Sequence, residues 1–130
     1  MVQRDFIMVQ IEELGKVMAQ LISRRETGAT RQIPEQIQTV YRSLKLNRDF
    51  LMTAAPEDIV QALDGDDRGG MLRMDIAARA LIEESYLFSG RQQQDMLLKA
   101  QTLLEYLQTH DRTFSLERLA LLDDLRRRKE

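Results

Sequence analysis

Apolar residues recur at every third or fourth position along most of the chain, the spacing that places side chains on one face of an α-helix. The first such stripe consists of Ile7, Ile11, Leu14, Met18 and Leu21. Gly15 interrupts the stripe at a cost of about 1 kcal/mol relative to alanine, and it lets a neighbouring helix approach closely. Arg24 and Arg25 suit the negative end of the helix dipole and Gly28 suits a left-handed cap, so we expect the first helix to end near Gly28.

Prolines mark the starts of the next two predicted helices, because proline at the first helical position loses no hydrogen bond that the helix needs. The helix that begins at Pro34 has the apolar stripe Ile33, Ile37, Val40, Tyr41 and Leu44. Asn47 is the expected left-handed residue at its end. A third, short helix is expected between Pro56 and the segment "DGDDRGG".

Three further helices are predicted in the second half of the chain. Residues 72 to about 88 are rich in Ala, Leu and Ile, so this helix is expected to be the most buried. After the break at Ser89-Gly90 comes a helix with the stripe Met96, Ala100, Leu103 and Leu107. Ser115 is the expected N-cap of the last helix, and Phe114 and Leu119 are spaced to form a hydrophobic staple around it.

These elements predict an all-α fold, because no stretch alternates convincingly between apolar and polar residues as a strand would. Amphipathic helices joined by short connections pack antiparallel. We therefore expect one domain over residues 1–130, with five to six helices in antiparallel hairpins. Its core should include Leu14, Leu81, Ala100 and Leu103.

The composition is typical of a globular protein, with 43% hydrophobic and 31% charged residues. The absence of cysteine excludes disulfides and thiolate chemistry. The first 15 residues include four charged ones, which is unlike a signal peptide, and no run of about 18 apolar residues predicts a bilayer span. We therefore expect a cytoplasmic protein without a membrane partner. The net charge of −2 supplies no general attraction to nucleic acid.

Two segments carry possible site chemistry. His110 is the only histidine and could act as a base or metal ligand, but in the last turn of a helix it also suits the helix dipole. In "DGDDRGGMLRMD", Asp64, Asp66 and Asp75 fall at ligand positions of a calcium-binding EF-hand loop. Arg68 places a positive charge where calcium needs an oxygen ligand, so we expect an acidic connector without calcium. No catalytic residue, metal site or cofactor is predicted.

A basic patch at the end of the chain could contact phosphate groups. It consists of Arg126, Arg127, Arg128 and Lys129. Asp123 and Asp124 precede these residues at helical spacing and can pair with the arginines. We therefore interpret the patch as a solvated helix end, and nucleic-acid or phosphate binding is the alternative function.

The first predicted helix has more apolar residues than one neighbouring helix would cover. Phe6, Met8, Val17 and Met18 are the predicted partner surface. We expect the partner to be another protein or a second copy of this chain. Met8 and Met18 would suit such a contact, because methionine side chains adapt to different surfaces.

Two resemblances support this interpretation. Tyr86, Gly90 and Ala100 resemble a tetratricopeptide repeat, in which an aromatic, a turn glycine and small residues fix a helical hairpin. The small positions of the second helix, counted from Gly90, are occupied here by Asp95 and Thr102. In addition, "RDFIMVQIEELGKVMAQLI", the acidic turn and "YLFSG" resemble a bacterial domain-of-unknown-function family of small, tetratricopeptide-like proteins. That resemblance implies a helical fold and a bacterial source, and no catalytic residues.

The sequence therefore predicts a non-enzymatic protein-interaction or scaffolding module. A groove or apolar helix face would receive a helix or peptide from the partner.

Overall fold

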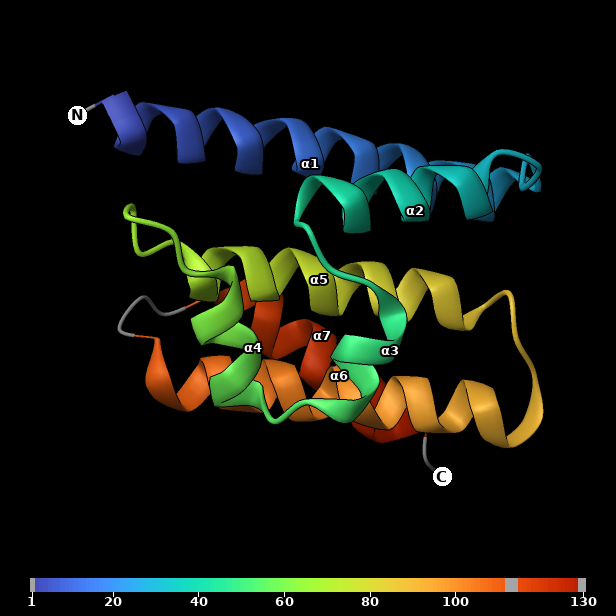
Figure 1. The fold of residues 1–130 in the computed structure, drawn as a ribbon. Coiled ribbons are helices and arrows are strands. Elements are labelled where there is room, and N and C mark those ends of the chain that lie inside the picture. The colour runs from blue at the N-terminus through green and yellow to red at the C-terminus, as the bar shows by residue number, and fades with distance from the viewer. Residues whose placement is uncertain (1, 112–114, 129–130) are drawn as a thin grey trace.

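The computed structural model describes residues 2–111 and 115–128, with side chains from Phe6 onward, and confirms the all-α fold. Seven helices lie within these residues (Figure 1): α1 (Val2–Thr27), α2 (Ile33–Ser43), α3 (Arg48–Thr53), α4 (Pro56–Leu63), α5 (Gly70–Ser85), α6 (Gly90–His110) and α7 (Leu116–Arg128).

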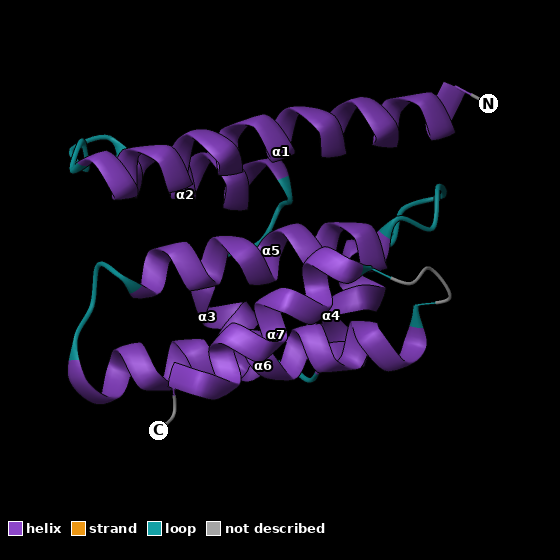
Figure 2. Cartoon of the chain, turned by 180° about the vertical axis from the view of Figure 1, so that it is seen from behind, coloured by secondary structure: helices purple, strands orange, loops and turns teal. Residues whose placement is uncertain are grey.

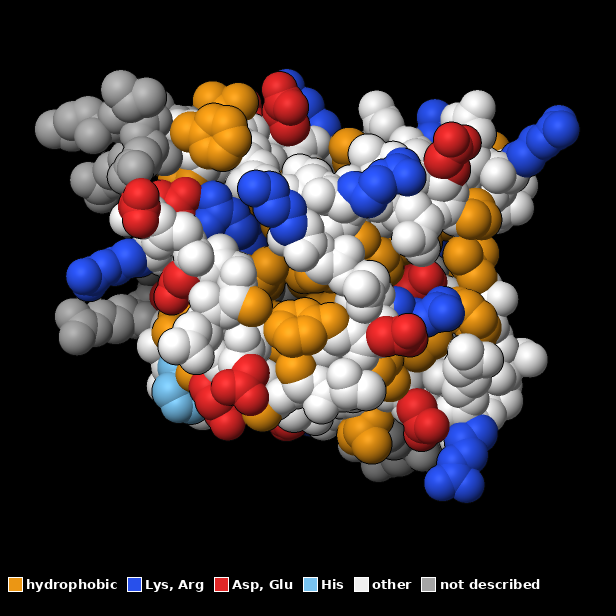
Figure 3. Space-filling view, in the orientation of Figure 1, with side chains coloured by type: hydrophobic (Ala, Val, Ile, Leu, Met, Phe, Trp, Pro, Cys, Tyr) orange, Lys and Arg blue, Asp and Glu red, His pale blue; other side chains and the backbone are white. Residues whose placement is uncertain are grey.

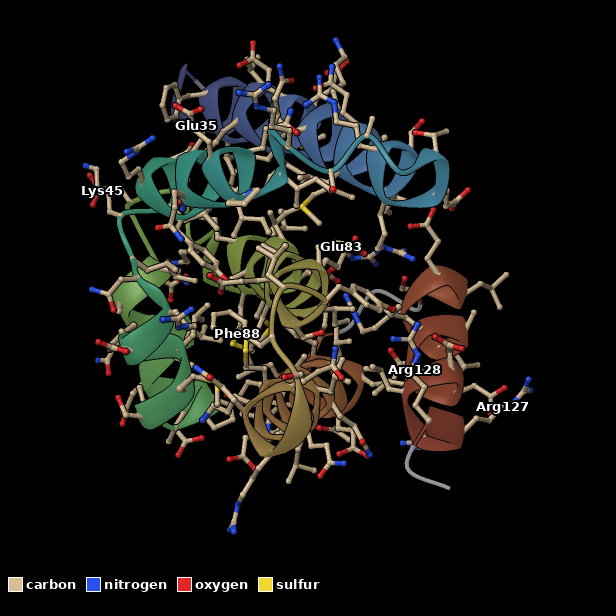
Figure 4. The ribbon with its side chains drawn as sticks, turned by 90° about the vertical axis from the view of Figure 1, so that its right-hand side faces the viewer. Glu35, Lys45, Glu83, Phe88, Arg127 and Arg128 are labelled. Atoms are coloured by element: carbon tan, nitrogen blue, oxygen red, sulfur yellow. The ribbon has the colours of Figure 1, made fainter. Side chains whose placement is uncertain are left out.

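The helix α5 is the centre of the bundle. It packs against α1, α2, α4 and α6, while α7 packs against α6. Figure 4 looks along the helices and shows α5 surrounded, with α1 and α2 above, α3 and α4 on the left, α6 below and α7 on the right. Figure 2 shows the same layers from behind, with α5 between α1 and the α6–α7 layer. The expectation that this helix is the most buried one is confirmed by twelve buried residues in α5.

Most predicted helix ends are confirmed. The helices α2 and α4 have Pro34 and Pro56 in their first turns, and the Ser115 hydroxyl accepts a hydrogen bond from the Arg118 backbone N–H over 3.1 Å. Gly28 and Gly90 have φ values of +82° and +62°, in the left-handed region that side chains disfavour. Gly90 therefore reverses the chain between α5 and α6, as predicted. The expected staple partner Phe114 lies outside the described residues.

The connection after α2 differs from the prediction. The left-handed residue is Lys45, with a φ of +60°, whereas Asn47 is extended. The Asn47 side chain accepts a hydrogen bond from the Phe50 backbone N–H over 2.9 Å and so caps α3. This six-residue helix was absent from the sequence-based prediction, which is why the described residues contain seven helices rather than five or six.

The core is aliphatic and extends through the whole bundle. The four residues expected there are all buried, with Leu81, Ala100 and Leu103 completely inaccessible and Leu14 at 5% exposure. Ala77, Ala78 and Ala80 of α5 are also fully buried. Because their side chains are small, the neighbouring helices can pack close to α5. Close packing around α5 fixes the positions of α1 and α6, and through α6 that of α7.

Candidate functional site

The four residues predicted as a partner surface do not form one surface. Phe6 and Met8 are 64% and 60% exposed, whereas Val17 is partly buried against the core. Met18 is 5% exposed and packs in the core, with only its edge accessible. The reason is helical geometry, since Met18 follows Leu14 by four residues and precedes Leu21 by three, in the middle of the face that α5 covers.

The two exposed residues also lie on different sides of α1. Met8, Gly15 and Ile22 are seven residues apart and so follow one line along the helix, because seven residues make about two turns. Phe6 lies eleven residues before Val17, on the side where the Gln10 amide contacts Ser43 of α2. The line through Met8 and Gly15 leads to a groove between α1 and α7.

A groove of about 500 Å³ lies between α1 and α7 and has α5 as its floor. One wall is α1, one wall is α7, and the lining is mainly apolar. The lining residues are Ile11, Gly15, Met18, Ala19 and Ile22 of α1, Leu72, Asp75, Ile76, Arg79, Ile82 and Glu83 of α5, and Glu117 and Leu121 of α7. Figure 4 shows Glu83 on α5 directed toward the space between α1 and α7. From Leu72 to Glu83 the floor is about 16 Å long, or roughly three helical turns.

The wall formed by α1 is low at its middle because its residues there are small. Apart from its chain neighbours and the backbone of its own helix, a Cβ atom built on Gly15 would have no heavy atom within 4 Å, so this position opens onto empty space. Ala19, one turn further along, is exposed. Ile76 and Ile82 of the floor are almost completely buried beneath this opening. The groove can therefore accept apolar side chains close to the α1 backbone.

Three charged residues follow one another along the floor at intervals of four. Asp75, Arg79 and Glu83 lie on the same side of α5. The Arg79 guanidinium donates to Asp75 Oδ1 over 2.5 Å and lies 3.5 Å from Glu117 Oε2. Because the Arg79 side chain is 25% exposed, it is the charge on the floor that a bound molecule would meet.

The other charges of the floor hold the walls in place. Arg118 of α7 is 4% exposed and donates to Asp75 Oδ2 over 3.1 Å and to Asp111 Oδ2 over 3.1 Å. On the opposite wall, Arg25 of α1 donates to Glu83 Oε1 over 2.8 Å, and this hydrogen bond raises the pKa of the Arg25 guanidinium. Each wall is thus tied to α5 by an arginine whose carboxylate partner is largely buried.

Directly after α5, an aromatic ring lies close to two arginines. The Arg25 guanidinium lies 4.4 Å from the centre of the Tyr86 ring, and the Arg128 guanidinium lies 5.2 Å from it. Cations at these distances are attracted to the face of an aromatic ring. The ends of α1, α5 and α7 therefore meet at Tyr86.

The basic patch of the last helix is paired with acidic side chains. Arg127 and Arg128 bind Asp123 and Asp124 over 2.5 and 2.8 Å, as predicted from their spacing. Arg126 instead reaches α6 and binds Glu105 over 2.9 Å. Lys129 lies outside the described residues. In the view of Figure 3, basic and acidic side chains are intermingled over the surface.

Carboxylates of the acidic connector form hydrogen bonds and ion pairs with other groups of the protein. Asp64 Oδ1 accepts a hydrogen bond from the Gly70 backbone N–H over 2.7 Å, at the start of α5. Asp67 binds the largely buried Arg73 through both oxygens, over 2.9 and 2.7 Å. Asp75 faces Arg79 and Arg118 rather than the connector. Asp64 and Asp75 therefore take part in separate contacts, and the described residues contain no group of three or more acidic or histidine side chains placed to hold a metal ion.

His110 lies at the exposed end of α6. Its Nδ1 is 2.8 Å from the Tyr106 carbonyl oxygen, and its ring stacks on the Tyr106 ring at 3.9 Å. Both contacts are local to the last turn of the helix, which is the arrangement expected from a histidine near the negative helix end.

Glu83 and Glu84 are adjacent but serve different contacts. Glu84 is 3% exposed and accepts a hydrogen bond from the Tyr41 hydroxyl over 2.8 Å, while Glu83 binds Arg25. The two carboxylates therefore diverge around the helix. Sequence analysis missed the groove itself, although the interval of four between Asp75, Arg79 and Glu83 is visible in the sequence.

Comparisons of the chain with known protein families, with curated proteins and with solved structures gave no match. Within residues 2–111 and 115–128, no helix has both the length and the apolar character needed to cross a bilayer. The resemblance to a bacterial, tetratricopeptide-like family remains a prediction.

Proposed function

We propose that this protein is a non-enzymatic protein-interaction module, and that the groove between α1 and α7 receives an α-helix of a partner protein. The observation that carries the proposal is the opening at Gly15, where an apolar floor lies next to a helix wall without side-chain bulk. Amphipathic helices bind to such grooves through apolar side chains spaced three and four residues apart.

The dimensions of the groove support a helix as the bound element. Packed helices lie about 8–10 Å apart, and small residues at the contact favour the shorter distances. Gly15 and Ala19 are one turn apart on the wall, so they offer a continuous strip of small residues to an incoming helix. The floor length of roughly three turns matches the contact that a short helix makes.

The charges of the groove support binding rather than catalysis. Asp75 and Glu83 are each paired with an arginine of a neighbouring helix, and these two ion pairs fix the walls to α5. In the proposed function they are structural ties, and Arg79 is a polar contact for the partner. The tetratricopeptide-like organisation is part of the proposal, because stacked helical hairpins of that kind form concave surfaces for peptides.

Variants of Gly15 test the proposal. Gly15→Leu places a side chain in the open space, whereas Gly15→Ala adds only a methyl group. Both replace glycine within a helix, so both should raise the free energy of unfolding by about 0.5–1 kcal/mol. The probe is a set of fluorescent amphipathic peptides of about 18 residues, long enough to form a helix on binding.

We expect the wild type and Gly15→Ala to bind at least one peptide of the set with similar affinity. Gly15→Leu should bind it at least about tenfold more weakly, a difference of about 1.4 kcal/mol, while its melting temperature stays at or above that of the wild type. Equal binding by Gly15→Leu, or no peptide bound by the wild type, would overturn the proposed function.

A further inference from the structure

The groove has acidic residues along both edges. On α1, Glu12 and Glu26 lie seven residues before and after Ala19, so all three follow one line at the outer edge of this wall. Both glutamates are exposed. Gly15 and Ile22 lie on the neighbouring line, toward the floor.

The edge formed by α7 repeats this pattern. Glu117 and Asp124 are also seven residues apart, with the groove residue Leu121 between them. Their side chains are 83% and 52% exposed. Glu117 approaches Arg79 only to 3.5 Å, and Asp124 pairs with Arg128 four residues away. Exposed pairs of this kind contribute little to stability, so both carboxylates can exchange their contacts for those of a bound partner.

We infer that the partner helix is basic, with an apolar face flanked on both sides by lysine or arginine. This inference rests on the proposed function and names the partner chemistry of the same groove. The apolar face would lie on Ile76 and Ile82, and the flanking cations would reach the acidic edges, as charges do at the borders of a coiled-coil seam. Complementary charges of this kind also accelerate association, and the acidic edges disfavour acidic partners.

The same edges argue against anionic partners in the groove. Nucleic acids and anionic lipid surfaces bind to clusters of lysine and arginine. Here the exposed carboxylates of Glu12 and Glu117 at the two edges would repel phosphate groups, while Arg79 on the floor is already paired with Asp75. A basic amphipathic segment of a protein fits both the apolar floor and the acidic edges.

The test uses three synthetic peptides with one apolar face and with lysine, glutamine or glutamate at all flanking positions. Glu12→Lys combined with Glu117→Lys reverses the charge of both edges. The matched control, Glu35→Lys with Glu57→Lys, makes the same change in net charge at exposed positions of α2 and α4. Figure 4 shows Glu35 on the side of the molecule away from α7. Circular dichroism verifies the fold of each variant.

We expect the wild type to bind the lysine peptide at least about tenfold more tightly than the glutamate peptide at low salt, with a smaller ratio at 1 M salt, where the Debye length is about 3 Å. The edge variant should reverse this preference and the control should keep it.

Equal affinity for all three peptides, still abolished by Gly15→Leu, would overturn the inference and leave the proposed function standing. Binding that is insensitive to Gly15→Leu would instead overturn the proposed function. Binding of the wild type to anionic vesicles or RNA, lost in the Gly15→Leu variant, would also overturn the inference.

Discussion

The Tyr41 hydroxyl of α2 donates a hydrogen bond to Glu84 Oε1 of α5 over 2.8 Å, inside the core. The two residues are 1% and 3% exposed. Burial, together with the negative charge of Glu84, raises the pKa of Tyr41 well above its ordinary value. Arg48 of α3 supplies a positive charge 3.3 Å from Glu84 Oε2. This carboxylate therefore joins α2, α3 and α5.

Tyr41→Phe should lower the free energy of unfolding by about 1–3 kcal/mol, because it leaves a buried carboxylate with one hydrogen bond fewer. The measurement is denaturant unfolding followed by circular dichroism. Tyr106→Phe removes a hydroxyl from a partly buried ring on α6 and is the matched control. An effect of Tyr41→Phe no larger than that of the control would show that this contact does not stabilise the fold.

The pair formed by Asp67 and Arg73 should make stability depend on pH in the acidic range. The hydrogen bond from Arg73 lowers the pKa of Asp67 from 3.8 to about 2 in the folded protein. A carboxylate with a lowered pKa stabilises the fold above its unfolded pKa, and this contribution is lost as the pH falls from about 4 to about 2. Asp67→Asn should therefore be less stable than the wild type at pH 7, and the difference should shrink across this range.

The measurement is the free energy of unfolding as a function of pH. The same measurement on Asp95→Asn, at an exposed carboxylate, is the control. A difference between Asp67→Asn and the wild type that stays constant from pH 7 to pH 2 would contradict this assignment.

Leu103 lies completely buried at the centre of α6. Leu103→Ala should cost about 2–5 kcal/mol, because it removes buried methyl groups and leaves a cavity. Leu98→Ala on the same helix is the control, since Leu98 is 49% exposed. Melting curves that coincide for the two variants would contradict the assignment of the α6 core face.

Self-association through the start of α1 is a separate prediction. Phe6 and Met8 are large, exposed apolar residues on two sides of α1, and each can contact an apolar surface of a second copy of the chain. Light scattering at increasing concentration should show dimers of the wild type that Phe6→Glu with Met8→Glu abolishes. If both proteins are monomers with equal melting temperatures, this part of α1 is not a self-association surface.

The local features of the fold could be predicted from the sequence because they depend on nearby residues. The stripe through Leu103, the proline at the start of α4 and the serine at the start of α7 each act within one or two helical turns. The six-residue α3 was missed because a helix this short has less than two turns in which a periodic stripe could appear. Its signal was the side chain of Asn47, which suits a cap at either end of a helix.

The groove could not be predicted because it depends on the distance between α1 and α7, which are far apart in the sequence. The excess of apolar residues on α1 predicts a partner surface on this helix, and Met8 lies on the line that leads to the groove. A count of apolar residues does not say which of them α5 covers, and so it could not separate the largely buried Met18 from the exposed Phe6 and Met8. Glu84 was likewise interpreted without its contacts, since Tyr41 is 43 residues away.

The most direct test of a helix-binding groove is a nuclear magnetic resonance titration of the ¹⁵N-labelled protein with the lysine-flanked peptide. We expect the largest amide shift changes at the groove, including Gly15 and Ala19 of α1, Arg79 of α5 and Leu121 of α7, and we expect them to disappear in Gly15→Leu. Shift changes confined to α2, α3 and α4, or a spectrum unchanged at millimolar peptide, would contradict a helix-binding groove.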